Sequence, residues 1–481
     1  MHGSRTRGIC ESGCNIRQGK GPHIPCSGKI KAIKLLNIAG AYWRGDESRK
    51  QLTRIYGVSF PKQKELTAHL ELLEEAKKRD HRKLGRELGL FLFHHWAPGA
   101  PFWLAKGTIL YNLLADYMRE VLWPAGYVEL KTPIVYNKAL WETSGHWEHY
   151  RENMFLVEST DSQPMGVKAM NCPGHMLVFA SEVRSYRDLP IRFHEQTPLH
   201  RNEASGVLAG LIRVRQFAQD DAHCFVTEDQ IGEEVARLLR LVERVYGDFD
   251  LTPVLRLSTR PVEFLGESAQ WDHAETQLKE ALAEVGLPYT VDEGDGAFYG
   301  PKVDIQFTTL LGREESMSTI QLDFAAKERF SLTYKDETGA ENGEVFVIHR
   351  APLSTHERFV AFLTEHWAGS FPTWLSPVQV QVITISEKHR EYAAEVREAL
   401  ETAGVRVQVD DSDNTIGKKI RMHRKTRPAY MVILGDEEAS DRTVSIRGRG
   451  GNQKKGVGLD EFVSDVFAEI SNRSRELSLD E

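Results

Sequence analysis

Arginines and carboxylates are concentrated in two strings, HRNE at residues 200–203 and RVRQFAQDDAH at residues 213–223. An arginine guanidinium can bind a phosphate or a carboxylate through two parallel hydrogen bonds, and a neighbouring aromatic ring such as Phe217 can stack on a nucleotide base. Surface ion pairs, which are common and individually weak, would produce the same composition. The two strings therefore indicate either an anion-binding loop or a salt-bridged surface.

One cysteine and two histidines could together form a metal site. Cys172 lies in MNCPGH, His223 ends the second arginine string, and His349 begins HRAPLSTHER. These residues are too far apart in the sequence for a zinc finger, and for each of them alone a buried core residue is the more common interpretation. All three side chains together would suit a zinc ion whose fourth position stays open for catalysis.

The composition limits the classes of protein to which the chain can belong. It has 481 residues, of which 41% are hydrophobic and 27% charged. At about 100 to 200 residues per domain, this length predicts two to four folded domains. No stretch reaches the roughly 18 apolar residues of a membrane-spanning helix, so we expect no membrane partner. The phosphate-binding patterns GxxxxGK[ST] and strand-anchored GxGxxG are absent.

The cysteine content and the first residues bear on the compartment. Five cysteines are an odd number and too few for a disulfide framework, which favours a reducing environment. The first ten residues, MHGSRTRGIC, lack the apolar core of a secretory signal. Residues 1–45 are basic, but their glycines and prolines disfavour the amphipathic helix of a mitochondrial presequence. We therefore expect a cytoplasmic protein.

The candidate residues lie in a middle region that mixes helical and strand periodicity. Apolar residues between Ile109 and Val121 form one helical stripe, and Tyr127–Pro133 reads as a strand. Thr227 and Gln230 form a capping box before another helix. Because strands and helices do not alternate regularly, we expect an antiparallel α+β domain over residues 61–375 that begins with a solvated linker helix at 61–90.

The pattern changes after Pro372 and Pro377. Strand, helix, strand, strand and helix are predicted at residues 378–385, 388–402, 405–409, 431–434 and 459–470. We expect residues 376–481 to form a small α/β domain.

Eleven strings in register resemble the threonyl-tRNA synthetases, a family of class II aminoacyl-tRNA synthetases. They are AYWRGD (41–46), LTRIYG (52–57), KRDHRKLG (78–85), SGHW (144–147), KAMNCPGH (168–175), YRDLP (186–190), HRNE (200–203), QDDAH (219–223), GAFYGPK (296–302), IQLDF (320–324) and FPTWL-PVQV (371–380). The resemblance implies a class II catalytic domain built on an antiparallel sheet, followed by an α/β anticodon-binding domain.

The resemblance also implies a two-step reaction. Threonine and ATP give threonyl adenylate and pyrophosphate, and the threonyl group then passes to the 3′ end of tRNA(Thr). The implied ligands of one zinc ion per chain are Cys172, His223 and His349, and magnesium accompanies ATP. The class further implies a homodimer. Zinc ligation by the threonine hydroxyl would exclude valine by roughly 10⁴ or more, whereas serine, which lacks only a methyl group, would be rejected far less.

Individual roles are carried over onto matching positions. Arg201 would contact the α-phosphate and the carboxylate, Glu203 and Phe217 the adenine, and Arg213 and Arg358 the terminal phosphates. Asp221 would receive the threonine hydroxyl, and His146 would accept a proton near the tRNA end. The other implied pocket residues are Tyr299, Lys302, Gln219, Thr319 and Gln321.

The N-terminal residues depart from the family. Gly21, Pro22 and His23 match the end of a C-R-G-P-H editing motif, but Gly19 and Lys20 stand at the cysteine and arginine positions. No upstream histidine pair precedes them. We expect residues 1–60 to be a vestigial tail of the editing region, without editing of Ser-tRNA in cis, and a separate factor could then act in trans.

Two alternative functions stay open at this point. Ala204, Gln216 and Pro352–Thr355 differ from the usual family residues, which is compatible with a paralogue that forms the adenylate for antibiotic resistance or another non-translational role. A catalytically inactive RNA-binding regulator is the second alternative. The intact arginines and metal-ligand candidates argue against inactivity.

The charge distribution is compatible with tRNA although the formal net charge is −8. Residues 1–45 carry eight Lys or Arg and one acid, and residues 417–455 carry eleven and four. Between Gly417 and Arg427 all seven ionisable side chains are Lys, Arg or His. We expect this last segment to face phosphates.

Overall fold

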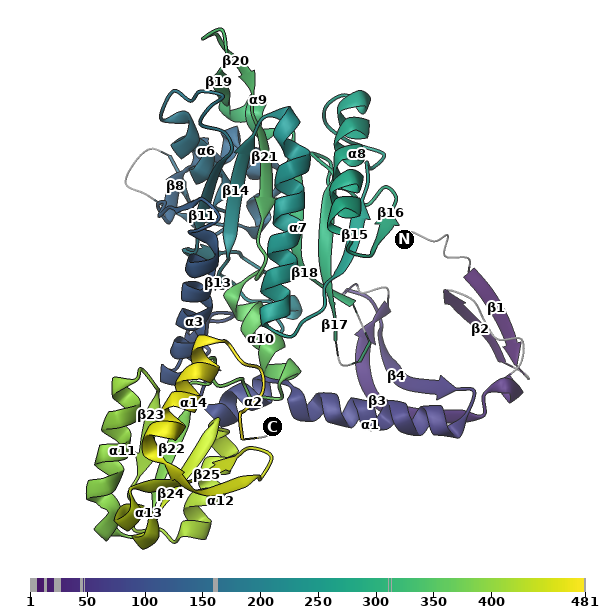
Figure 1. The fold of residues 1–481 in the computed structure, drawn as a ribbon. Coiled ribbons are helices and arrows are strands. Elements are labelled where there is room, and N and C mark those ends of the chain that lie inside the picture. The colour runs from purple at the N-terminus through teal and green to yellow at the C-terminus, as the bar shows by residue number, and fades with distance from the viewer. Residues whose placement is uncertain are drawn as a thin grey trace. The chain divides into compact units, whose positions relative to one another are not determined.

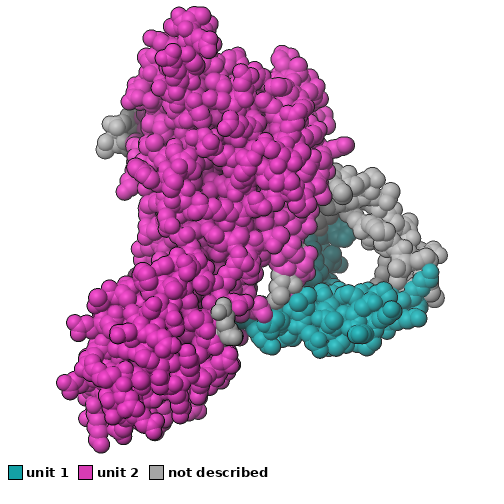
Figure 2. Space-filling view, in the orientation of Figure 1, with its two compact units in different colours: residues 1–78 teal, residues 79–481 magenta. Residues whose placement is uncertain are grey.

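The computed structural model describes residues 7–12, 15–20, 27–43, 46, 48–158, 163–309, 311–312 and 314–479. The chain divides into two compact units, residues 1–78 and residues 79–481 (Figure 2). The editing-motif positions Gly21–His23 lie outside the described residues.

The first unit contains two hairpins and most of one helix (Figure 1). Strands β1 (Arg7–Ser12) and β2 (Asn15–Lys20) pair antiparallel, as do β3 (Ala32–Tyr42) and β4 (Gln51–Phe60). A short 3₁₀ turn, η1 (Ser27–Lys29), precedes β3, and helix α1 (Gln63–Arg79) follows β4. The sequence did not predict β3 and β4, because their apolar residues do not alternate regularly with polar ones and many of them are exposed.

The second unit is built around an eight-stranded sheet. Its strand order is β16-β15-β17-β18-β21-β14-β11-β7, and all neighbours are antiparallel except the outermost pair at each edge. The bounds are β7 (Tyr127–Glu129), β11 (Ile191–Glu195), β14 (Asp221–Val226), β15 (Val254–Ser258), β16 (Tyr289–Asp292), β17 (Lys302–Thr308), β18 (Glu314–Asp323) and β21 (Phe346–Arg350). The predicted antiparallel α+β architecture is confirmed.

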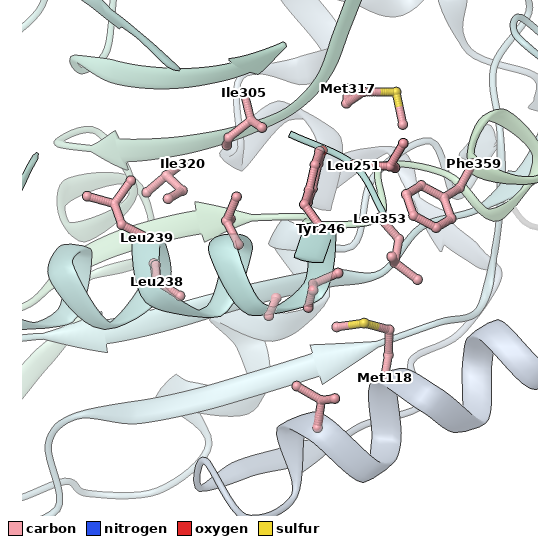
Figure 3. Close-up of a cluster of buried hydrophobic side chains, with 14 of the residues drawn as sticks. Met118, Leu238, Leu239, Tyr246, Leu251, Ile305, Met317, Ile320, Leu353 and Phe359 are labelled. Carbon is pink, nitrogen blue, oxygen red and sulfur yellow. The ribbon is translucent and has the colours of Figure 1, made fainter. Parts of the chain in front are cut away.

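Helices pack on this sheet and close its hydrophobic core. The predicted capping box is present, and after the 3₁₀ turn η5 (Glu228–Gln230) it leads into α7 (Ile231–Asp248). Met118 of α3 (Ala105–Leu122), Leu239 and Tyr246 of α7, and Ile305 and Ile320 of the sheet belong to one buried cluster (Figure 3). Helices α8 (Ser268–Val285) and α10 (His356–His366) add further residues to it.

Shorter elements surround the sheet. The helices and 3₁₀ turns are α2 (His81–Leu88), α4 (Lys138–Thr143), α5 (His146–His149), η3 (Arg151–Asn153), α6 (Cys172–Ala180), η4 (Ser205–Val207) and α9 (Ala326–Phe330). The strands are β5 (Phe91–Phe93), β6 (Pro101–Trp103), β8 (Val135–Asn137), β9 (Leu156–Val157), β10 (Met165–Val167), β12 (Pro198–His200), β13 (Gln216–Ala218), β19 (Thr333–Lys335) and β20 (Glu341–Glu344).

The C-terminal part of the second unit has its own five-stranded sheet and core (Figure 1). The strand order is β23-β22-β24-β25-β26, in which β22 runs parallel to β23 and β24 and the other pairs are antiparallel. The bounds are β22 (Val380–Thr384), η6 (Glu387–His389), α11 (Arg390–Thr402), β23 (Val407–Asp410), α12 (Ile416–Thr426), β24 (Tyr430–Leu434), α13 (Asp436–Asp441), β25 (Thr443–Gly448), β26 (Gln453–Gly458) and α14 (Leu459–Ser471). The sequence did not predict strands β25 and β26, because both contain glycines, which weaken the pattern of a strand.

Helix α12 corrects one detail of the predicted basic segment. Lys419 is 1% exposed, and its Nζ donates to the carbonyl oxygens of Thr384 and Asp410 at 2.9 and 3.2 Å. Its charge therefore holds the helix against the sheet, whereas Lys418, Arg421, Arg424 and Lys425 are exposed. Among the described residues, no helix has the length and hydropathy needed to cross a lipid bilayer.

Candidate active site

The predicted metal ligands come together although they are distant in the sequence. Cys172 is the first residue of α6, and His223 and His349 lie on the paired strands β14 and β21, directly opposite each other. One ligand atom from each of the three residues lies within 4.8 Å of the others. The register of two antiparallel strands thus creates a site with one sulfur and two imidazole donors, a set typical of zinc.

Both histidines have partners that orient their rings. Nε2 of His349 lies 3.1 Å from a carboxylate oxygen of Asp323, and Nδ1 of His223 lies 2.8 Å from Nδ1 of His175. His175 in turn places its Nε2 3.2 Å from Glu195. Metal-binding histidines usually have such partners on the ring nitrogen that does not bind the metal.

Glu195 is held as a carboxylate in the interior. Burial alone would raise the pKa of Glu195, but hydrogen bonds from His175, Lys168, the Thr132 amide and Thr197 lower it to about 2. The Lys168 ammonium lies 2.8 Å from Glu195, and both side chains are fully buried. The fixed carboxylate of Glu195 therefore contacts His175, and His175 contacts His223 of the cysteine-histidine cluster.

A cavity of about 330 Å³ opens beside this cluster. Ten of the residues singled out in the sequence line it: Cys172, Arg201, Gln219, Asp221, His223, Tyr299, Thr319, Gln321, His349 and Arg358. Asp221 in the cavity wall accepts a hydrogen bond at 3.0 Å from the buried Asn171, and the Tyr299 hydroxyl donates to Gln321 at 3.3 Å. Burial raises the pKa of Asp221. The cavity thus offers cationic, amide, hydroxyl and carboxylate groups to polar ligands.

The arginine strings form a loop on β12 and β13 rather than a scattered salt-bridged surface. The Arg201 guanidinium lies 5.0 Å from the ring centroid of Phe217, and Arg213 pairs with Glu203 at 2.9 Å. Arg358 donates through Nε to the backbone oxygen of Ile212 at 3.2 Å, and burial lowers its pKa. Stacking and hydrogen bonding thus hold the guanidinium groups at defined positions. Arg201 and Arg358 line the cavity, whereas Arg213, Glu203 and Phe217 are not among its lining residues.

Two predicted residues lie next to this cavity. His146 lines a second cavity of about 320 Å³, which shares Met170, Cys172, Tyr299 and His349 with the first. Lys302 on β17 pairs with Asp304 at 2.5 Å, and Asp304 also accepts a hydrogen bond from Thr319 at 2.8 Å. Lys302 is therefore connected to the cavity wall through Asp304 and Thr319.

Several site residues were not singled out in the sequence. They are Asn171, Met170, His175, Glu195, Asp323 and Arg350, which line the cavities or contact the predicted site residues directly or through His175. Four of them, Met170, Asn171, His175 and Asp323, stand inside strings that carry the family resemblance, which was the available signal. Arg350 directly follows His349 in the chain, but its burial and its contact with Asp220 at 3.1 Å appear only in the fold.

Comparison with known families matches three segments. Residues 155–367 match the class II core domain of the glycyl, histidyl, prolyl, seryl and threonyl tRNA synthetases. Residues 379–469 match an anticodon-binding domain, and residues 20–56 match the second additional domain of threonyl and alanyl tRNA synthetases. The core match contains the three cluster residues and the arginine loop.

Individual relatives extend over nearly the whole chain. The threonine–tRNA ligase of Anaeromyxobacter dehalogenans strain 2CP-C is 50% identical over 469 residues, which cover 96% of this chain and 72% of that protein. Threonine–tRNA ligase 2 of Bacillus subtilis strain 168 is 47% identical and covers 94% and 71%.

Solved structures of threonyl-tRNA synthetases are also similar to this chain. The RNA-binding domain of the Cryptosporidium parvum Iowa II threonyl-tRNA synthetase has a TM-score of 0.77 at 43% identity, covering 83% of this chain and 100% of that one. A structure described as a threonyl-tRNA synthetase, ThrRS-1 from Aeropyrum pernix, has a TM-score of 0.73 at 27% identity, covering 83% and 97%. Together with the class II core and the anticodon-binding domain, these matches show that the chain belongs to the threonyl-tRNA synthetases and is a threonine–tRNA ligase.

Proposed function

We propose that threonine and ATP react in the 330 Å³ cavity, and that some of the assigned residues bind threonine whereas others bind ATP. The observation that supports this most directly is the arrangement of Arg201, Asp221 and the cysteine-histidine cluster around one cavity. Arg201 would stabilise the negative charge that develops when the threonine carboxylate attacks the α-phosphorus and pyrophosphate leaves.

The remaining ATP contacts are proposed from the arginine loop. Phe217 and Glu203 would hold the adenine, Arg213 and Arg358 the terminal phosphates, and Thr319 would complete the nucleotide site. In this structure Arg213 is paired with Glu203. When ATP binds, phosphate oxygens would replace Glu203 as the partner of Arg213. Magnesium accompanies ATP in class II synthetases and would share the phosphate charge.

Threonine would be bound between the cysteine-histidine cluster and Asp221. Cys172, His223 and His349 fit zinc by donor type and by mutual distance. Zinc bound there would supply a Lewis-acidic position for the amine and the hydroxyl of the substrate. Asp221 would accept the hydroxyl proton of threonine in a hydrogen bond, with Tyr299, Gln219 and Gln321 around it and Lys302 supporting the wall through Asp304.

For the transfer to tRNA we assign His146 as the proton acceptor. Burial lowers the pKa of His146 to about 4, so the ring is neutral near pH 7. Its Nδ1 lies 2.8 Å from Ser144 Oγ, and its Nε2 lies 2.7 Å from the sulfur of Met170. One of these contacts must therefore break before the ring can accept a proton from the 3′-terminal adenosine.

We also propose that the enzyme is a cytoplasmic homodimer. Strand β7 forms one edge of the eight-stranded sheet, where its Val128 is 52% exposed and the nearby Trp123 is 78% exposed. These apolar side chains next to a sheet edge suit a symmetric interface. Light scattering on the purified protein measures the mass directly, and a strictly monomeric mass would contradict the assignment.

Editing of Ser-tRNA by this chain is not expected. Gly19 and Lys20 replace the cysteine and arginine of the family's editing motif. The experiment is aminoacylation of tRNA(Thr) with threonine, valine and serine, together with elemental analysis for zinc. We expect rapid charging with threonine, discrimination against valine of roughly 10⁴, and Ser-tRNA that accumulates unless an editing factor is added in trans. Rapid release of serine by the protein alone would show that it edits.

A further inference from the structure

His81 is a buried histidine outside the cavity that contacts the arginine loop directly. It is the first residue of α2 and is 3% exposed. Its Nε2 lies 3.1 Å from the backbone nitrogen of Leu211, and its Nδ1 lies 2.7 Å from a carboxylate oxygen of Glu365. An amide N–H can only donate, so Nε2 of His81 is the acceptor and the ring proton is on Nδ1, where it is donated to Glu365.

The contact with the loop is close. A methyl group added at Gly210 would lie 2.2 Å from Nε2 of His81, so the loop backbone passes directly over the imidazole. Leu211 is completely buried in the main core. The turn is closed by the amide of Ala209, which donates to the oxygen of Arg213 at 3.1 Å. The imidazole therefore holds a compact turn over residues 209–213.

This turn carries Arg213 and supports Arg358, which lines the cavity. Arg213 is its last residue and pairs with Glu203. The backbone oxygen of Ile212 accepts the Nε hydrogen bond of Arg358 at 3.2 Å. A shift of the turn would therefore move both guanidinium groups, although His81 itself is not among the residues that line the cavity.

We propose that His81 is a positioning residue for ATP: the lone pair on its Nε2 holds the 209–213 turn so that Arg213 and Arg358 are placed to receive the terminal phosphates. The inference rests on the proposed phosphate-binding role of these two arginines. If His81 only stabilised the fold, its loss would lower stability without a selective effect on ATP.

Two substitutions separate the two hydrogen bonds of the ring. In His81→Gln the side-chain oxygen can reach the place of Nε2 and accept from Leu211, whereas in His81→Asn the amide lies near the place of Nδ1 and leaves the Leu211 amide without an acceptor. In threonine-dependent pyrophosphate exchange we expect His81→Asn to raise the KM for ATP about tenfold or more, with a much smaller change in the KM for threonine. His81→Gln should recover most of the ATP affinity.

Hydrogen exchange of the Leu211 amide gives an independent readout, because it should accelerate in His81→Asn and not in His81→Gln. Equal KM values for ATP in the two variants, or an equal rise of both KM values in His81→Asn, would overturn the inference. If His81→Asn does not fold, Gly210→Ala disturbs the same contact from the loop side and should raise the KM for ATP selectively. An unchanged KM for ATP in Gly210→Ala would also overturn the inference.

Variants of the arginines distinguish failure of the inference from failure of the proposed ATP site. Arg213→Ala and Arg358→Ala should each raise the KM for ATP. If they do and His81→Asn does not, only the role of His81 is wrong. If neither arginine variant affects ATP, the phosphate-binding assignment itself is wrong.

Discussion

Nδ1 of His175 lies 2.8 Å from Nδ1 of His223, and this contact determines where His223 can carry its proton. Glu195 is an anion and accepts from Nε2 of His175, so the Nδ1 of a neutral His175 is an acceptor. His223 must then donate from Nδ1, which leaves the lone pair on its Nε2 for a ligand. A buried glutamate thus selects the histidine tautomer that a metal requires.

The tautomer argument predicts opposite effects of two substitutions at His175. The side chain in His175→Asn can place an oxygen near Nδ1 and still accept from His223, whereas His175→Gln keeps only the contact with Glu195. We expect His175→Gln to weaken zinc binding by about 10 to 100-fold and His175→Asn to weaken it less. Competition with a chromophoric chelator measures the affinity, and the reverse order would contradict the proposed tautomer.

Removal of the thiol ligand should remove the metal. We expect Cys172→Ala to lose both bound zinc and threonine-dependent pyrophosphate exchange. Cys224→Ala is the matched control, because Cys224 is fully buried in the hydrophobic core and is not part of the cluster. Elemental analysis and the exchange assay check both proteins, and a Cys172→Ala protein with full activity would refute the site.

Substitution of Arg201 tests whether its guanidinium stabilises the transition state of adenylate formation. Lysine keeps the positive charge but loses the planar pair of donors, so Arg201→Lys should lower kcat of adenylate formation by about 10² to 10³. The control is Arg397→Lys, which changes an exposed arginine on α11 paired with Glu401. Pyrophosphate exchange at saturating ATP reports the effect. Equal rates for the two variants would argue against a role of the guanidinium in the chemical step.

Adjacent lysines on α12 should behave differently. Lys419→Ala leaves the carbonyl oxygens of Thr384 and Asp410 without their buried donor and should destabilise the C-terminal part by about 1 to 3 kcal/mol. Lys418 is exposed, so Lys418→Ala should weaken tRNA binding and reduce its salt dependence, with little effect on stability. Urea unfolding and tRNA binding at several salt concentrations test the pair. A stability loss in Lys418→Ala alone would contradict the assignment.

Glu357 predicts a pH dependence of stability. Burial raises the pKa of its carboxyl from the usual 4.5 to about 8, and the carboxyl accepts the Ala218 amide at 3.1 Å. The folded state binds this proton more tightly, so the free energy of unfolding should fall as the pH rises from 4.5 to 8, by up to about 1.4 kcal/mol per pH unit.

The neutral isostere provides the comparison for Glu357. Glu357→Gln cannot titrate, so its stability relative to the unchanged protein should increase between pH 5 and pH 8.5. Urea unfolding of both proteins at a series of pH values measures the difference. Parallel pH profiles would show that the carboxyl does not titrate in this range.

Local sequence patterns predicted those parts of the protein whose structure depends mainly on residues that are close together in the chain. The capping box at Thr227 and the apolar periodicity of residues 231–245 specified α7, and the signature strings identified the family and the donor types of the site. The strands β3 and β4 were not predictable in this way, because their exposed apolar residues do not alternate regularly with polar ones.

Only the tertiary structure decided which distant residues meet. The register of β14 and β21 places His223 opposite His349, the packing of α12 turns Lys419 inward, and α2 brings His81 to the amide of Leu211. Strand register and helix packing depend on burial of the whole domain, so no local pattern encodes them. The chemistry of the side chains was therefore readable from the sequence, whereas their partners, and with them tautomer, charge state and position, follow from the fold.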